Sequence, residues 1–195
     1  MTEELSPKAQ EIAGRARALL TAGGYHSFSY ADLAAQVSIT KASIHHHFPS
    51  KAQLVKTVVI QHREEMMQGL AMLEDRINDP LAALNAYAER WAECIRTSAP
   101  PFCISAMVAA ELPTIPEEVA DEVRSHFEGL CIWLESVLKK GARLGQIRLE
   151  HDAATAARSL MAVVHGAMLV ARALGDPKAF HAIVQPAIRG LGKTS

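Results

Sequence analysis

The chain has 195 residues, of which 49% are hydrophobic and 21% charged. These proportions are typical of a globular protein that buries its own core, and they exclude disordered and fibrous sequences. The three cysteines form no C-x-x-C pair, which argues against a disulfide framework and favours a cytoplasmic location. Because the N-terminus is acidic and no run of 18 apolar residues occurs, we expect neither secretion nor a membrane span.

The net charge of −1 hides a difference between the two parts of the chain. Residues 1–63 hold seven Lys and Arg against four Asp and Glu, and the remainder holds 13 against 17. The first part is therefore +3 and the remainder −4. This asymmetry suits a protein that contacts the phosphates of a nucleic acid with one end only.

Hydrophobic residues recur at helical spacing along the whole chain, and the two-residue alternation of β-strands is absent. We therefore predict an all-α fold of about nine helices. Prolines and glycines place many of the boundaries, because proline favours the first turn of a helix and glycine follows the last. The helices expected beyond residue 79 run over about 80–99, 101–111, 117–144, 152–174 and 177–191, with Pro186 kinking or shortening the last one.

Two short helices are predicted after a first helix over about 7–22. Ser29 and Asp32 form a capping box, which opens the first of the short helices. Thr40 is a good N-cap for the second, and a further capping box at Ser50 opens a long helix. Two short helices joined by a tight turn can place the second of them in the major groove of DNA.

The segment over residues 29–54 resembles the helix-turn-helix of the TetR family of transcription regulators. The residues that carry this resemblance are Ala34, Val37, Ser38, Thr40, Lys41, Ser43, Phe48, Ser50, Lys51 and Leu54. The resemblance is good over residues 7–60, whereas the remainder is similar only in the number and length of its helices. One departure is that His45 and His47 stand where the family usually has tyrosines.

The resemblance implies a repressor that binds operator DNA as a homodimer and leaves it when a small effector binds. It implies a helix-turn-helix DNA-binding domain over 1–62 and a ligand-binding and dimerisation domain over 63–195, with the last two helices forming the dimer. No cofactor, metal or membrane partner is expected, and the protein is expected to be cytoplasmic. It is not expected to be an enzyme.

The DNA-contacting residues are expected around the second short helix. Lys41 and His46 are the candidates for hydrogen bonds to bases, and Tyr30 and His47 have packing inside the domain as an equal alternative. Three consecutive histidines cannot converge on one metal ion, because successive helical positions diverge by about 100°. The groove-facing candidates are Thr40, Lys41, Ala42, Ser43 and His46, and the phosphate-contacting candidates are Ser29, Tyr30, His45, His47 and Lys51.

The effector-contacting residues are inferred from the family, and core packing is the safer interpretation of any single one of them. Glu111 and His165 are ionisable residues among apolar neighbours, so they must be paired if they are buried; the alternative is that either lies at the surface. Cys103 starts a short helix, whose dipole would lower the thiol pKa and favour reaction with electrophiles; the alternative is a small buried hydrophobe. The candidates are Trp91, Phe102, Cys103, Met107, Glu111, Trp133, Met161 and His165.

Two other classes of function were compatible with an all-α chain. A helical-bundle enzyme would need E-x-x-H repeats on facing helices or a catalytic triad, and neither is present. A helical scaffold for a protein partner would bind no DNA, so an operator-binding measurement separates it from the regulator.

Overall fold

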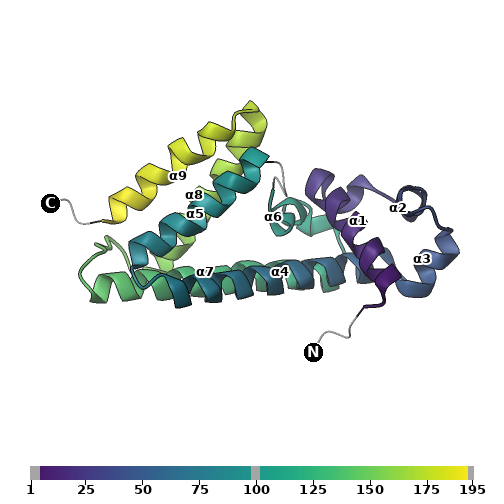
Figure 1. Cartoon of the computed structure of the whole chain (residues 1–195), viewed down its shortest axis with the longest axis horizontal. Coiled ribbons are helices and arrows are strands. Elements are labelled where there is room, and N and C mark those ends of the chain that lie inside the picture. The colour runs from purple at the N-terminus through teal and green to yellow at the C-terminus, as the bar shows by residue number, and fades with distance from the viewer. Residues whose placement is uncertain (1–4, 98–101, 193–195) are drawn as a thin grey trace. The chain divides into compact units, whose positions relative to one another are not determined.

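The computed structural model describes residues 5–97 and 102–192. Within these ranges the chain forms nine α-helices and two short 3₁₀ helices, and an isolated bridge between Ile147 and Gly192 is the only β-type pairing. This confirms the all-α prediction. In chain order the elements are α1 (Pro7–Gly23), η1 (Tyr25–Ser27), α2 (Tyr30–Val37), α3 (Lys41–His47), α4 (Lys51–Arg76), α5 (Pro80–Thr97), α6 (Ile104–Ala109), η2 (Leu112–Thr114), α7 (Glu117–Arg143), α8 (Ala153–Leu174) and α9 (Pro177–Leu191) (Figure 1).

The helices divide into two compact units. The first unit comprises residues up to Glu64 together with 102–126, and the second comprises 65–101 and the residues from Phe127 onward. By this division the segment 102–126, with α6 and η2, groups with the N-terminal helices. The domain boundary expected after residue 62 stays a prediction. We call residues 5–64 the head.

The head is a three-helix core that rests on the start of α4. Ile12 and Leu20 of α1, Leu33 of α2 and Ile44 of α3 are fully buried, as is Leu54 of α4. The predicted capping boxes explain where these helices begin. The Ser29 side chain accepts hydrogen bonds from the backbone of α2 while Asp32 accepts one from the Ser29 N–H at 2.7 Å. Both short helices are thus fixed by caps and by a few buried side chains.

A left-handed residue makes the turn between α2 and α3. Ser38 has φ 55° and ψ 43°, and it is the only non-glycine residue with positive φ in the described ranges. Its conformation ends α2 in the way that a C-terminal glycine commonly does. Thr40 then caps α3 by accepting a hydrogen bond from the Ser43 N–H at 3.1 Å. The tight turn that the sequence predicted is therefore present.

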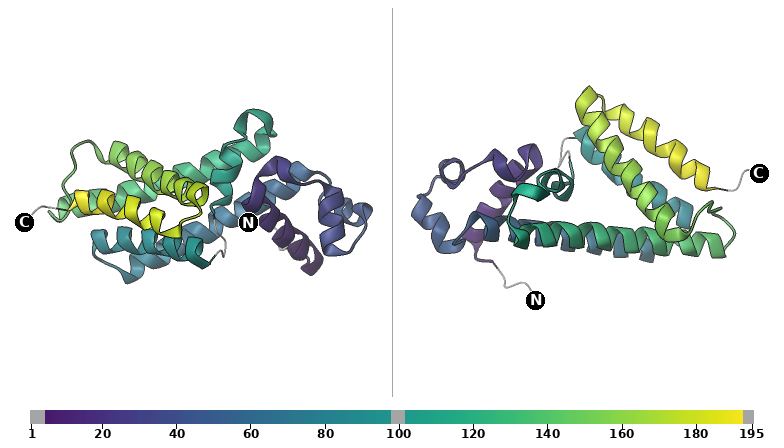
Figure 2. Two further views of the ribbon diagram at one scale, coloured as in Figure 1. Left: turned by 90° about the horizontal axis from the view of Figure 1, so that it is seen from above. Right: turned by 180° about the vertical axis from the view of Figure 1, so that it is seen from behind.

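The second unit packs α5, α8 and α9 with the later part of α7. Figure 2 shows α9 beside both α8 and α5, in agreement with the contacts between these helices. The rings of Phe127 and His165 lie 5.2 Å apart, and one turn further along α7 the Cys131 sulfur lies 3.5 Å from that of Met161. These pairs fix α7 and α8 in an antiparallel register.

Two features of the helices differ from the sequence prediction. The 3₁₀ helices η1 and η2 were not predicted, because three residues are too few for a hydrophobic period. Pro186 was expected to kink or shorten the last helix; α9 reaches Leu191, the end that the sequence predicted, so it is not shortened. Pro186 and Ala182 are both exposed, so water can bind the carbonyl that proline leaves without a donor. The boundary expected at Pro100-Pro101 lies outside the described residues.

Helix α8 combines an apolar composition with a half-exposed surface. Leu169, Val170 and Leu174 are 59%, 40% and 69% exposed. By length and composition alone α8 would suffice to cross a membrane. One such helix is weak evidence for a span, because a core or pairing helix of a soluble protein has the same composition. The apolar face of α8 therefore calls for a partner surface in the folded protein.

Candidate nucleic-acid interface

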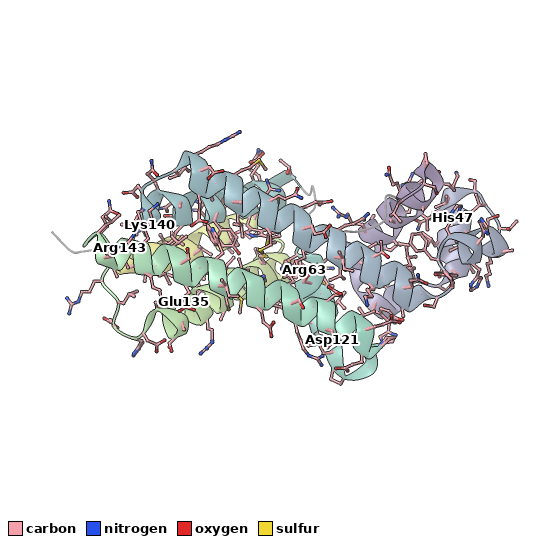
Figure 3. All side chains as sticks on the ribbon, turned by 90° about the horizontal axis from the view of Figure 1, so that it is seen from below. His47, Arg63, Asp121, Glu135, Lys140 and Arg143 are labelled. Atoms are coloured by element: carbon pink, nitrogen blue, oxygen red, sulfur yellow. The ribbon has the colours of Figure 1, made fainter. Side chains whose placement is uncertain are left out.

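The surface of α3 carries most of the predicted DNA-contacting side chains. Only Ile44 is buried among the seven residues of this helix. Figure 3 shows His47 at the end of α3, and this side chain is half-buried. An exposed polar surface on a helix that follows a tight turn is the arrangement that reads a major groove. The exposed members of the predicted set are Ser29, Thr40, Lys41, Ala42, Ser43, His45 and His46.

Tyr30 lies inside the head. Its side chain is 9% exposed, and its hydroxyl donates a hydrogen bond to the Phe48 carbonyl oxygen at 2.9 Å. Burial, with a smaller contribution from Tyr25, raises the pKa of Tyr30 to about 12. The ring also packs edge-on against His45, with the ring centres 4.9 Å apart. The packing alternative thus describes Tyr30, whose hydroxyl is not directed to phosphate in this structure.

Lys51 also makes internal contacts. Its ammonium donates a hydrogen bond to the Phe28 carbonyl oxygen and lies 4.3 Å from the centre of the Phe28 ring and 4.6 Å from that of Tyr25. Burial lowers the pKa of Lys51, whereas the charges of Glu111 and Asp32 act in the opposite direction. Lys51 therefore ties α4 to η1 and the segment after it. Its contact with phosphate stays a prediction.

Glu111 binds the backbone of the head. Its carboxylate accepts hydrogen bonds from the N–H groups of Tyr25 at 2.5 Å and His26 at 3.0 Å. Gly24 permits this approach, because it has φ 84° and a Cβ at this position would lie 2.4 Å from the Glu111 Oε2. The sequence predicted a paired carboxylate or an exposed one, and Glu111 is paired with main-chain donors. This contact links the N-cap residue of η2 to η1.

The eight effector-contacting candidates do not all belong to one unit. Each unit contains four of them, and several are buried. Those of the first unit are Phe102, Cys103, Met107 and Glu111, and those of the second are Trp91, Trp133, Met161 and His165.

Two of the effector candidates in the second unit have a buried polar atom without a hydrogen-bond partner among the described residues. They are the Trp133 Nε1 and the His165 Nε2. The His165 Nδ1 lies 2.9 Å from the Met161 carbonyl oxygen, so only the second ring nitrogen remains unsatisfied. Burial lowers the pKa of His165 and favours the neutral imidazole. Buried polar atoms of this kind are rare and commonly mark a ligand or water position.

Cys103 agrees with the second of its two sequence interpretations, the small buried hydrophobe. The thiol is fully buried, and burial raises its pKa to about 11 in spite of favourable hydrogen bonds from Ala106 and Ser105. The expected lowering of the pKa at a helix start is therefore wrong, because desolvation raises the pKa by more than the start of this short helix lowers it. At neutral pH, Cys103 is therefore a thiolate in only a small fraction of the protein molecules.

We expect Cys103 to react more slowly with maleimide than Cys94 and Cys131, which are both partly exposed. A limiting amount of maleimide on the native protein, followed by digestion and mass spectrometry, measures the occupancy of each thiol. Denatured protein, in which all three thiols are accessible, is the control. Preferential native labelling of Cys103 would contradict the burial argument and return it to the class of reactive cysteines.

The sequence also missed a cluster in the first unit. The Cys103 sulfur lies 3.6 Å from the His62 Nε2 and 3.7 Å from the His126 Nε2. These residues come from the end of the head, the start of the α6 segment and α7. Their separations of 41 and 23 residues form no local motif, so only the fold brings them together.

Comparison with known proteins agrees with the geometry of the head. Residues 12–58 match the family described as bacterial regulatory proteins, tetR family, and residues 80–186 match the tetracyclin repressor-like, C-terminal domain. The Escherichia coli K12 regulator UidR is 28% identical over 67 residues, and this match spans 34% of the chain and 34% of UidR.

Solved structures extend the similarity over the whole described chain. A TetR-family transcriptional regulator from Agrobacterium tumefaciens is 48% identical, with a TM-score of 0.94 over 95% of this chain and 98% of that one. A TetR transcriptional regulator from Legionella pneumophila is 23% identical, with a TM-score of 0.85 over 97% and 100% of the two chains, which shows a shared fold. The chain belongs to the TetR family of transcription regulators.

Proposed function

We propose that this regulator is a homodimeric repressor that binds a near-palindromic operator through α3 and is released by a small, non-covalent effector. The exposed polar surface of α3, held by one buried isoleucine and a Thr40 cap, is the observation that carries the DNA-binding part. The positive charge of the first third of the chain supports the same assignment.

The proposed contacts divide between bases and phosphates. Lys41 and His46 would donate hydrogen bonds to base edges from the exposed side of α3. Ser29 and His45 are exposed at the two ends of the helix pair, where phosphates of the flanking backbone would lie. Lys51 would contribute to DNA binding by holding α4 against η1 and the segment after it. A direct contact with phosphate would add to this effect.

The dimer would form through α8 and α9. Gly166, Leu169, Val170 and Leu174 recur at three- and four-residue spacing, so they share one side of α8. The three large residues are exposed, and among the described residues no atom outside the adjoining part of α8 lies within 4 Å of a Cβ built at Gly166. Ile183 of α9 is also exposed. A second copy that covers this apolar surface would give a four-helix interface of the isologous type.

The effector would bind in the second unit. Trp133 and His165 each offer a buried polar atom, and Phe127 and Met161 supply apolar contacts beside His165. An effector that is mostly apolar and has one or two hydrogen-bonding groups fits these residues. The buried thiol of Cys103 supports a non-covalent effector in preference to an electrophile.

Membership of a family of transcription regulators supports a non-enzymatic function. A regulator acts in the compartment that holds the chromosome, which supports the cytoplasmic location. The helical-bundle enzyme is not favoured. The alternative of a scaffold for a protein partner would apply only if the chain bound no operator DNA.

Selection of bound fragments from the genome of the source organism tests this proposal. We expect a small set of fragments that share an inverted repeat and stay bound in excess competitor DNA. Addition of the effector should lower the affinity of the wild type, whereas a His165→Phe variant should bind the same fragments and respond more weakly. Recovery of fragments without a common sequence would contradict the repressor assignment.

A further inference from the structure

The first unit contains three metal-ligating side chains in one buried cluster. His62 lies on α4, Cys103 directly precedes α6, and His126 lies on α7. Cys103 and His126 are fully buried, and His62 is 8% exposed. Their donor atoms all lie within 4.8 Å of one another. We call these three residues the His–Cys–His cluster.

The two sulfur-to-nitrogen distances in the cluster match those around a tetrahedral zinc ion. Zinc bonds of about 2.3 Å to sulfur and about 2.0–2.1 Å to nitrogen separate the two donors by about 3.6 Å. The Cys103 sulfur lies 3.6 and 3.7 Å from the two Nε2 atoms. The imidazole rings of His62 and His126 are nearly parallel, with an interplanar angle of 19° and centres 5.2 Å apart. Because the donor atoms spread over up to 4.8 Å and two zinc-bound nitrogens lie about 3.3 Å apart, the two rings would turn toward each other when an ion binds.

The chemistry of the donors selects the class of metal. One thiolate and two imidazoles suit zinc and similar transition metals, whereas calcium and magnesium require oxygen ligands. No carboxylate of the described residues belongs to the cluster. Three protein ligands leave a fourth position for water or an exogenous group.

We propose that His62, Cys103 and His126 bind one Zn²⁺ ion, which joins α4, the start of α6 and α7 of the first unit. From the sequence alone we expected no metal, and this proposal departs from that expectation. On binding, a Zn–S bond replaces the S–H bond of Cys103 and the proton passes to solvent, while each neutral imidazole donates one nitrogen lone pair.

The surroundings of the cluster show why an ion there would stiffen the unit. Arg63, next to His62, forms an ion pair with Glu122 of α7 at 3.0 Å, four residues before His126. Figure 3 shows Arg63 where α4 runs beside this part of α7. Glu111, at the other end of the segment that Cys103 opens, holds η1 of the head. The ion would add a third connection to these two.

Titration of the metal-free protein with Co²⁺ tests the proposal independently of DNA binding. We expect a sulfur-to-cobalt charge-transfer band and the strong visible bands of a tetrahedral site, with a stoichiometry of one ion per chain and displacement by Zn²⁺. Cys103→Ser should remove the charge-transfer band, and His126→Gln should weaken binding at least about 100-fold, beyond the effect of losing an outer partner. Zn²⁺ should also raise the Tm of the wild type and not that of either variant.

Cys131→Ser is the matched control, because Cys131 is a partly buried thiol in the second unit. It should keep the bands and the zinc-dependent rise in Tm. Circular dichroism of the metal-free variants establishes that each one is folded, and Cys103→Ala supplies a second substitution if the serine variant is not. Absence of a charge-transfer band in the wild type, or a band that survives Cys103→Ser and Cys103→Ala, overturns the proposal.

Discussion

Replacing Ile44 with alanine should destabilise the head by about 2–5 kcal/mol, the usual range for a buried isoleucine, and abolish specific operator binding. Ile44 is fully buried and is the only buried residue of α3. A helix of seven residues is not stable by itself, so its position depends on this one side chain and on the Thr40 cap. The free energy of unfolding from urea titration and the affinity for the selected operator measure the two effects.

Ile44→Val is the matched control for this substitution. It removes one methylene group, which costs about 0.5–1.5 kcal/mol, and should leave operator binding close to that of the wild type. Hydrogen exchange should show faster exchange in α2 and α3 of the alanine variant and unchanged exchange in α9. A loss below about 1 kcal/mol for Ile44→Ala, with full operator affinity, would show that α3 is held by other contacts.

Acidification should destabilise the wild type more than a His165→Phe variant. Burial lowers the pKa of His165 in the folded protein, so as pH falls below about 6.5 the unfolded chain takes up a proton that the folded one does not. Stability is therefore full above that pH and is lost as pH falls toward the folded-state pKa. The difference between wild type and variant should grow at up to about 1.4 kcal/mol per pH unit in this window.

Urea titrations at pH 7.5 and at successive lower values measure this difference. His151→Gln provides the control, because His151 is exposed and its removal leaves the buried imidazole in place. The control should follow the wild type. Parallel curves for wild type and His165→Phe over the whole range would contradict the assignment of a buried neutral imidazole at His165.

Much of the head could be predicted because its helices begin at local signals. The capping residues Ser29 and Thr40 each bond to the backbone within three residues, and such contacts are encoded in short stretches of sequence. The partner that a side chain contacts can lie far away in the sequence, so a short stretch does not encode it. Tyr30 has a sequence position that suits a phosphate contact, but the Phe48 carbonyl oxygen, 18 residues away, accepts its hydrogen bond.

The contacts of residues beyond the head were less predictable, because they too join residues that are far apart in the sequence. The apolar period of α5, α7, α8 and α9 indicated helices, but it could not assign the segment 102–126 to the first unit. Glu111 contacts Tyr25 across 86 residues, and His62, Cys103 and His126 meet only in the fold. Long-range contacts of this kind leave no periodic trace in one sequence, so the pairing of Glu111 and the His–Cys–His cluster required the structure.

A hydroxyl-radical footprint of the purified protein on its tightest genomic fragment tests the central claim most directly. Two heads of a symmetric dimer should protect two half-sites of an inverted repeat, with centres separated by one helical turn, roughly 34–36 Å, or somewhat more in a splayed dimer. Lys41→Ala should leave the phosphate protection in place and relax the preference among bases within each half-site. Uniform protection of all sequences, or a single half-site bound with full affinity, would contradict operator recognition by a dimer.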